Sequence, residues 1–79
     1  MKNYFHMVEF RGISTHVGKD GKTGYRGHFE DEDFEAFSLY LGQDIGNLVS
    51  FKKTDILDLV CDFNQAYKYH TILEARLHE

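Results

Sequence analysis

The chain of 79 residues has a mass of 9.3 kDa and a formal net charge of −4, and it has room for a single domain. Hydrophobic residues make up 42% of the sequence and charged residues 28%, with no proline, and this composition excludes a disordered tail. No uncharged stretch approaches the roughly 18 apolar residues that a membrane-spanning helix needs. The single cysteine, Cys61, excludes an internal disulfide and a zinc site built from cysteine pairs. We therefore expect one compact soluble domain, residues 1–79, in the reducing cytoplasm.

Residues 4–29 have the pattern of a β-hairpin. Apolar and polar side chains alternate along the first half of this segment, and the parity of the alternation changes at Gly12. A β-bulge at Gly12 would return the apolar side chains to one face. A three-residue turn that ends in Gly21 places Thr15 opposite Tyr25, which brings the apolar residues of the two strands together.

A first helix is expected over residues 30–41. Its acidic start favours the positive end of a helix dipole, and Phe34, Phe37 and Leu41 recur at helical spacing. The alternative is a strand, in which Phe37, Leu39 and Leu41 share one face.

The remaining residues predict a short third strand over 47–52 and a second helix from Thr54 onward. Thr54 is a good N-cap residue, and apolar residues recur at helical spacing as far as Leu77. This helix either runs unbroken or breaks near Tyr69, where a capping-box pattern follows. The predicted fold is therefore α+β, in the order strand, strand, helix, strand, helix, with two helices on one face of a small antiparallel sheet. The predicted core consists of Phe10, Ile13, Tyr25, Phe29, Phe34, Phe37, Val49, Phe51, Ile56, Val60, Phe63 and Tyr67.

The sequence carries no catalytic or cofactor motif. The five histidines lack the spacing of a metal-binding pair, and Cys61 lies beside Asp58 and Asp62, which disfavour a reactive thiolate. The glycines do not follow the spacing of a phosphate-binding loop. We expect a protein that is not an enzyme and that has no catalytic residues, no cofactor and no metal.

Charge is distributed unevenly along the chain. Residues 1–29 have a net charge of +3, whereas residues 30–62 have a net charge of −7. An acidic surface attracts basic partners and repels nucleic-acid phosphates. We therefore predict a protein-binding module, an inhibitor or adaptor, that docks on a basic partner such as a nucleic-acid-binding protein. The residues predicted to make this contact are Glu30, Asp31, Glu32, Asp33, Glu35, Asp55, Asp58 and Asp62.

Two alternatives and one further property complete the interpretation. The first alternative is a nucleic-acid-binding accessory protein that uses the basic hairpin residues Arg11, Lys19, Lys22 and Arg26. The second is a small metal-binding protein. In size, acidity and lack of a catalytic signature, the chain is similar to the small inhibitor proteins of bacteriophages and mobile elements, anti-CRISPR inhibitors included. A homodimer through the C-terminal helix is also predicted, because the core of so small a domain would leave the apolar side chains of Tyr69, Ile72 and Leu77 uncovered.

Overall fold

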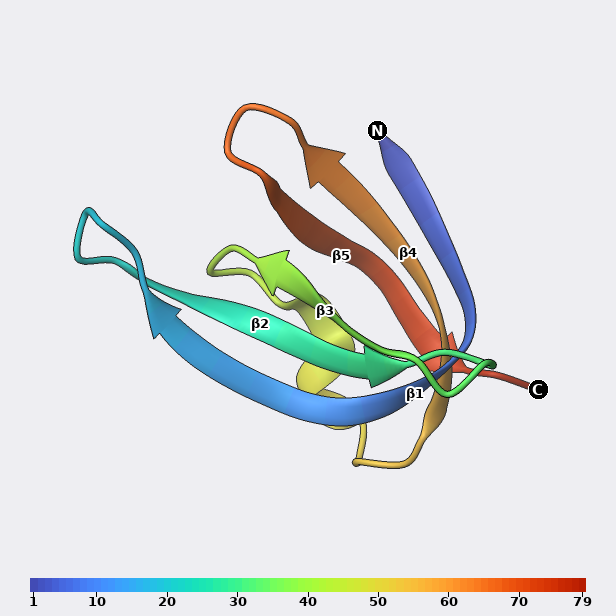
Figure 1. Cartoon of the computed structure of the whole chain (residues 1–79). Helices are drawn as coiled ribbons and strands as arrows, with labels where there is room; N and C mark the ends of the chain where they lie inside the picture. Colours follow the sequence, from blue (N-terminus) through green and yellow to red (C-terminus); the bar gives the residue numbers. More distant parts are fainter.

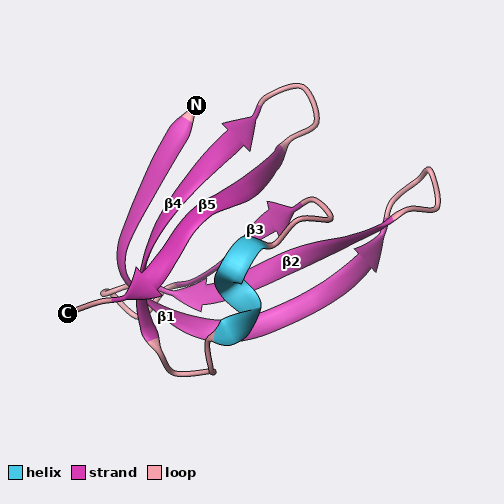
Figure 2. Ribbon diagram, turned by 180° about the vertical axis from the view of Figure 1, so that it is seen from behind, coloured by secondary structure: helices cyan, strands magenta, loops and turns pink.

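The chain folds into five β-strands and one short 3-10 helix, as Figure 1 and Figure 2 show. The computed structural model describes residues 1–79. The elements are β1 (Lys2–Val17), β2 (Thr23–Glu30), β3 (Ala36–Leu41), η1 (Gly46–Ser50), β4 (Ile56–Asn64) and β5 (Tyr69–Leu77). No helix is long and apolar enough to span a membrane.

The strands close into a barrel in the order β1-β2-β3-β5-β4. Strand β1 makes this closure possible because its first half pairs with β4 and its second half pairs with β2. It bends between the two partners at two irregularities, one at Met7 (φ 53°) and one at Gly12 (φ 113°). All neighbouring strands are antiparallel except β3 and β5, which are parallel and meet at one residue pair, Leu41 with His70.

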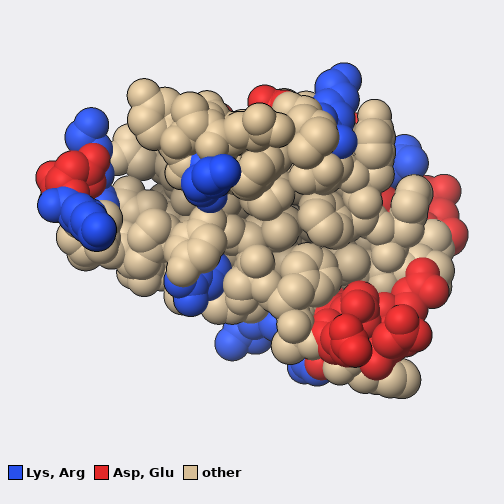
Figure 3. Space-filling view, turned by 45° about the horizontal axis from the view of Figure 1, so that its top comes forward, with Lys and Arg blue, Asp and Glu red and all other residues tan.

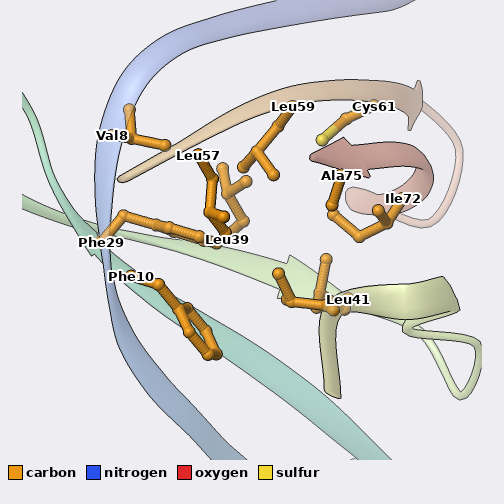
Figure 4. Packing of buried hydrophobic residues seen from close by; sticks show 11 residues of the cluster. Val8, Phe10, Phe29, Leu39, Leu41, Leu57, Leu59, Cys61, Ile72 and Ala75 are labelled. Carbon is orange, nitrogen blue, oxygen red and sulfur yellow. The ribbon is translucent and has the colours of Figure 1, made fainter. Parts of the chain in front are cut away.

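The core fills the interior of the barrel, where Figure 4 shows the apolar side chains converging from opposite strands. Leu48 of η1 is fully buried and plugs the space between the strands. Gly27 lies against Leu48 and Phe29, because a Cβ atom at that position would come within 3.5 Å of Leu48 Cδ2 and within 2.9 Å of the Phe29 ring. The buried residues are Val8, Phe10, Phe29, Leu39, Leu41, Leu48, Leu57, Leu59, Cys61, Ile72 and Ala75.

Helix η1 also covers the edge of β5 that β3 leaves largely unpaired. The Asn47 side chain donates a 2.7 Å hydrogen bond to the carbonyl oxygen of Ala75. A side chain at Gly46 would come within 3.0 Å of the Ile72 carbonyl oxygen, so the close approach of η1 to β5 requires glycine there. Covering a strand edge in this way blocks pairing with other chains.

The α+β prediction is wrong, because the segments predicted as helices are strands. In the first of them, the Asp31 carboxylate accepts hydrogen bonds from the Asp33 and Glu35 N–H groups at 2.9 and 3.0 Å. The acidic run therefore forms a turn between β2 and β3 rather than a helix N-terminus. The alternative of a strand through Phe37, Leu39 and Leu41 is confirmed.

The second predicted helix is the β4–β5 hairpin. Leu57, Leu59 and Cys61 are buried at every second position, which is the period of a strand. The helix was predicted because Val60, which faces outward, is also apolar and fits helical spacing together with the inward-facing residues. The side-chain oxygen of Asn64 accepts hydrogen bonds from the N–H groups of Ala66 and Tyr67, at 3.0 and 3.1 Å. These bonds stabilise the turn that reverses the chain before Tyr69.

Of the remaining sequence predictions, one is confirmed and several are wrong. The hairpin register is confirmed, since Thr15 pairs with Tyr25 and the bulge lies at Gly12. The third strand over 47–52 is wrong, because η1 occupies most of that segment. Thr54 is not an N-cap but a loop residue with a φ of 81°. Four residues of the predicted core are exposed: Phe34, Val49, Ile56 and Tyr67. The helix predicted to mediate a homodimer does not form, and Ile72 lies in the core instead.

The plug formed by Leu48 yields a prediction on stability. We expect Leu48→Ala to lower the free energy of unfolding by about 2–5 kcal/mol, because it leaves a cavity in the barrel. Val49→Ala is the matched control, since this neighbouring side chain is 64% exposed, and its effect should stay within about 0.5 kcal/mol. Urea denaturation followed by circular dichroism measures both values, and similar losses for the two variants would contradict the role of Leu48.

Candidate functional site

A groove of about 710 Å³ lies where the β1–β2 loop, the end of β3 and the β4–β5 loop converge. In Figure 1 the two loops project from the same side of the barrel, with the end of β3 between them. The hairpin arm of β1 and β2 extends beyond the rest of the barrel and gives the molecule its longest dimension, 39 Å. The aromatic and basic side chains that line the groove are His16, Lys22, Tyr40, Tyr67, Lys68 and Tyr69.

The β1–β2 loop forms one wall of the groove and is fixed by its own hydrogen bonds. The Gly18 N–H donates to the Lys22 carbonyl oxygen at 2.8 Å, and Gly21 adopts a φ of 80° that favours glycine. The Asp20 carboxylate accepts a 3.0 Å hydrogen bond from the Lys22 N–H. The loop therefore uses its acidic side chain internally and leaves the side chains of Lys19 and Lys22 exposed.

Tyr40 stands at the centre of the groove, on the outward face of β3. It is the cross-strand partner of Arg26, whose guanidinium carbon lies 4.2 Å from the centre of the Tyr40 ring and which donates a hydrogen bond to the Tyr40 hydroxyl. The His16 ring meets Tyr40 edge-on at 5.4 Å. His16 Nε2 and Arg26 Nε have no hydrogen-bond partner within the chain.

The β4–β5 loop presents two further aromatic rings. Tyr67 is 75% exposed and stacks on Tyr69, with the ring centres 6.2 Å apart and the planes 28° apart. Lys68, between them, has a φ of 58°, which belongs to the tight turn that Asn64 organises. The loop thus carries an exposed aromatic pair and a cation on the opposite side of the groove from the β1–β2 loop.

The outward face of β1, β2 and β3 continues from the groove as a polar row. His28 lies between two hydroxyls, with Nε2 2.7 Å from Ser14 Oγ and Nδ1 2.8 Å from Ser38 Oγ. At the far end of the row, the Arg11 guanidinium is 2.6 Å from a Glu30 carboxylate oxygen. This hydrogen bond and the charge of Glu30 raise the pKa of Arg11. Arg11 is therefore paired away from the groove, and of the other predicted basic residues only Lys22 lines it.

The acidic residues predicted to act together do not form one surface: those between β2 and β3 lie together, whereas those from Asp55 to Asp62 are spread along β4. Asp55 and Asp62 lie at opposite ends of β4, about 23 Å apart for seven residues of extended chain. The Asp55 carboxylate accepts a 2.8 Å hydrogen bond from the Lys52 N–H, and Asp62 lies 3.0 Å from the amine of Met1. Figure 3 shows acidic side chains gathered at the end of the molecule opposite the hairpin tip. Three side chains of the β2–β3 turn have no hydrogen-bond or ion-pair partner: Glu32, Asp33 and Glu35.

Asp58 fastens the irregular part of β1 to the end of the chain. Its carboxylate lies 2.9 Å from His78 Nδ1 and 3.4 Å from His6 Nδ1, and it accepts a 3.1 Å hydrogen bond from the Met7 N–H. These hydrogen bonds, that of His78 above all, hold the pKa of Asp58 below its usual range. The carboxylate therefore contributes to the packing of the bulge rather than to an exposed acidic stripe.

Cys61 lies in the core, and its burial raises the pKa of the thiol to about 11. A nucleophilic cysteine requires a depressed pKa and an accessible sulfur, and Cys61 has neither. No group of three or more histidine, cysteine or acidic side chains is placed to hold a metal ion.

The aromatic residues of the groove were not singled out as a binding site from the sequence. Tyr40 follows from the strand alternative, because it lies between the inward-facing Leu39 and Leu41 and must therefore point outward. Tyr67 and Tyr69 follow from the turn that Asn64 begins, which ends β4 and exposes the residues after it.

Comparisons with known proteins assign neither family nor function. The sequence matches no protein-family model and no curated protein, and the fold matches no solved structure. The residues of the groove and the topology of the barrel are therefore the basis for a functional inference.

The burial of Cys61 predicts an unreactive thiol. At mildly alkaline pH, we expect a disulfide reagent such as DTNB to label the folded protein far more slowly than the protein in guanidinium chloride, because the thiolate is disfavoured and the sulfur is covered. Absorbance of the released thiol product gives both rates. Labelling of the folded protein at the denatured rate would place Cys61 outside the core.

The hydrogen bonds of Asp58 predict a loss of stability in acid. Because its pKa is lowered by folding, its contribution is complete above the unfolded pKa of about 3.9 and is lost as the pH falls through the lower folded pKa. We expect Asp58→Asn to lower the melting temperature at neutral pH and to flatten the decline below about pH 4. Asp33→Asn, at a carboxylate without a partner, should keep the wild-type profile. Identical acid profiles for all three proteins would refute the assignment.

Proposed function

We propose that the protein binds single-stranded nucleic acid in the groove between the β1–β2 loop, the end of β3 and the β4–β5 loop. The observation that carries this proposal is the convergence of exposed aromatic rings and unpaired cations in that groove. The proposed site therefore includes the basic hairpin, which the sequence analysis gave as the alternative, rather than the acidic surface. It also includes the aromatic residues of the groove.

The barrel topology supports the choice of groove. A five-stranded Greek-key barrel with the strand order β1-β2-β3-β5-β4 and a helix between β3 and β4 is the arrangement of the OB-fold. Proteins of that fold bind oligonucleotides or oligosaccharides on the β2–β3 face, between the β1–β2 and β4–β5 loops. Because one fold hosts many functions, the topology indicates where a ligand would lie, and the side chains must indicate which ligand.

The aromatic side chains fit unpaired bases. Tyr67, stacked on Tyr69, offers an exposed ring in the β4–β5 loop, and Tyr40 with Arg26 offers a second flat surface at the centre of the groove. Stacking of a base on such a ring contributes about 1–3 kcal/mol and tolerates any base. In a duplex the base faces are covered by neighbouring bases, so these rings favour a single strand.

The charges of the groove fit a phosphate backbone rather than a neutral oligosaccharide. Two lysines line the groove, Lys22 and Lys68, and two further basic side chains lie beside it: Lys19 at the hairpin tip and Arg26 against the Tyr40 ring. The two acidic side chains, Asp20 and Asp44, accept hydrogen bonds from the backbone at 3.0 and 2.9 Å. The charged residues of the groove lining balance, and Lys19 and Arg26 beside it bring the local excess to two positive charges on a chain whose net charge is −4. The acidic end of the molecule would repel a phosphate backbone from elsewhere.

The proposal predicts that binding depends on the rings of the groove. Fluorescence anisotropy with labelled oligo-dT and oligo-rU should give tighter binding than a duplex of equal length. Tyr67→Ala and Tyr40→Ala should each weaken binding about 5- to 150-fold, which corresponds to the loss of one stacked base. Phe34→Ala is the matched control, because this ring is 84% exposed but lies in the β2–β3 turn, and it should leave binding unchanged.

The lysines are tested by the salt dependence of the same titration. Lys22→Ala should reduce the slope of log affinity against log salt by about 0.7, the value for one phosphate contact on a single strand. Lys52→Ala, outside the groove, should keep the wild-type slope. Equal loss on removing Phe34 or Lys52, or no binding to either oligonucleotide, would rule out the groove as a nucleic-acid site.

A second candidate function uses the opposite end of the molecule and preserves the idea of an inhibitor or adaptor that docks on a basic partner. Phe34 is 84% exposed at a φ of 62°, between the free carboxylates of Asp33 and Glu35. An aromatic anchor supplies affinity, and surrounding charges increase the rate of encounter. Affinity capture from lysate with wild type and Phe34→Ala tests this candidate. A partner retained equally by both proteins and insensitive to salt would exclude it.

A further inference from the structure

We propose that two copies of this chain associate through the outer face of β1, β4 and β5, away from the groove. This face presents three apolar side chains in a row, one on each strand: Tyr4, Val60 and Leu73. Tyr4 is 63% exposed and pairs across the strands with the half-buried Val60. Leu73, 52% exposed, lies on the other side of Val60.

A β-bulge in β5 creates the third member of this row. Val60 pairs with Glu74 and Cys61 pairs with Ile72, so Leu73 is the extra residue between them. Ile72 is buried, whereas Leu73 and Glu74 are both exposed. The bulge therefore turns an additional apolar side chain toward solvent at a position where the alternation of the strand would not place one.

The row is self-complementary about a two-fold axis parallel to β4. Strands β1 and β5 flank β4 on opposite sides, so this axis brings β1 of one copy over β5 of the other. Tyr4 then packs on Leu73 of the second copy, and Val60 meets its counterpart on the axis. The same residues serve on both sides of the contact, as a two-fold interface requires.

The charges beside the row point to a second copy as the occupant. Lys2 lies on the β1 side of the row, two residues from Tyr4, and Glu74 lies on the β5 side. Neither forms an ion pair within its own chain. The two-fold arrangement brings Lys2 of each copy within reach of Glu74 of the other, so the ion pair forms twice. None of these residues lines the groove.

Sedimentation velocity from micromolar to millimolar concentration tests the association. The mass of the wild type should rise from 9.3 kDa toward twice that value as the concentration increases. Val60→Lys should remain monomeric at every concentration. Val49→Lys is the matched control, because Val49 is an exposed valine on η1, and it should associate as the wild type does. Circular dichroism verifies the fold of each variant, and Leu73→Lys replaces Val60→Lys if the latter does not fold.

Charge reversal tests the geometry of the pair. Lys2→Glu and Glu74→Lys should each weaken association severalfold, and the double variant should restore it, because both ion pairs then form with reversed polarity. A wild type that stays monomeric throughout, a Val60→Lys dimer, or a double variant as weak as the single ones would overturn the proposal. Nucleic-acid binding by the groove is measured separately, so failure of one proposal leaves the other standing.

Discussion

The structure depends on the double pairing of β1. This strand hydrogen-bonds to β4 along its first half and to β2 along its second half, and only a bend between the halves lets a single strand belong to both sides of the barrel. Met7 and Gly12, both at positive φ, supply that bend. Once β1 has closed the sheet, the interior is a small apolar space that Leu48 of η1 fills, while the same helix covers the free edge of β5.

The same closure explains why the groove forms where it does. Strands β3 and β5 meet at the single pair of Leu41 with His70 and then diverge, so the barrel is weakest at this seam. Tyr40 and Tyr69 are the sequence neighbours of that pair, which places both rings at the opening. Burial at this seam lowers the pKa of His70, and the nearby Tyr40 backbone acts in the opposite direction with a smaller effect. The aromatic groove is thus a consequence of incomplete pairing between two parallel strands.

Local pattern was sufficient for the first hairpin and misleading beyond it. Parity around Gly12 and the turn at Gly21 determine the register of β1 and β2, because both signals are contained in adjacent residues. In β4, the outward-facing Val60 is apolar, so the segment lacks the strict alternation of apolar and polar residues that identifies a strand, and its apolar residues also fit helical spacing. The groove joins residues from three distant segments, so single-sequence periodicity could not reveal it, and of the basic hairpin residues named from the sequence only Lys22 lines it.

The separation of charge along the long axis has a further consequence. With cations at the hairpin tip and carboxylates gathered at the other end, 39 Å of protein behaves as a permanent electric dipole. In the field of a polyanion such a dipole experiences a torque before any contact forms, and the molecule rotates until the tip points at the charged strand. For the nucleic-acid ligand proposed above, this alignment would precede contact with the groove. The range of this alignment is set by the Debye length, about 8 Å at physiological ionic strength, so orientation would be lost first as salt is added.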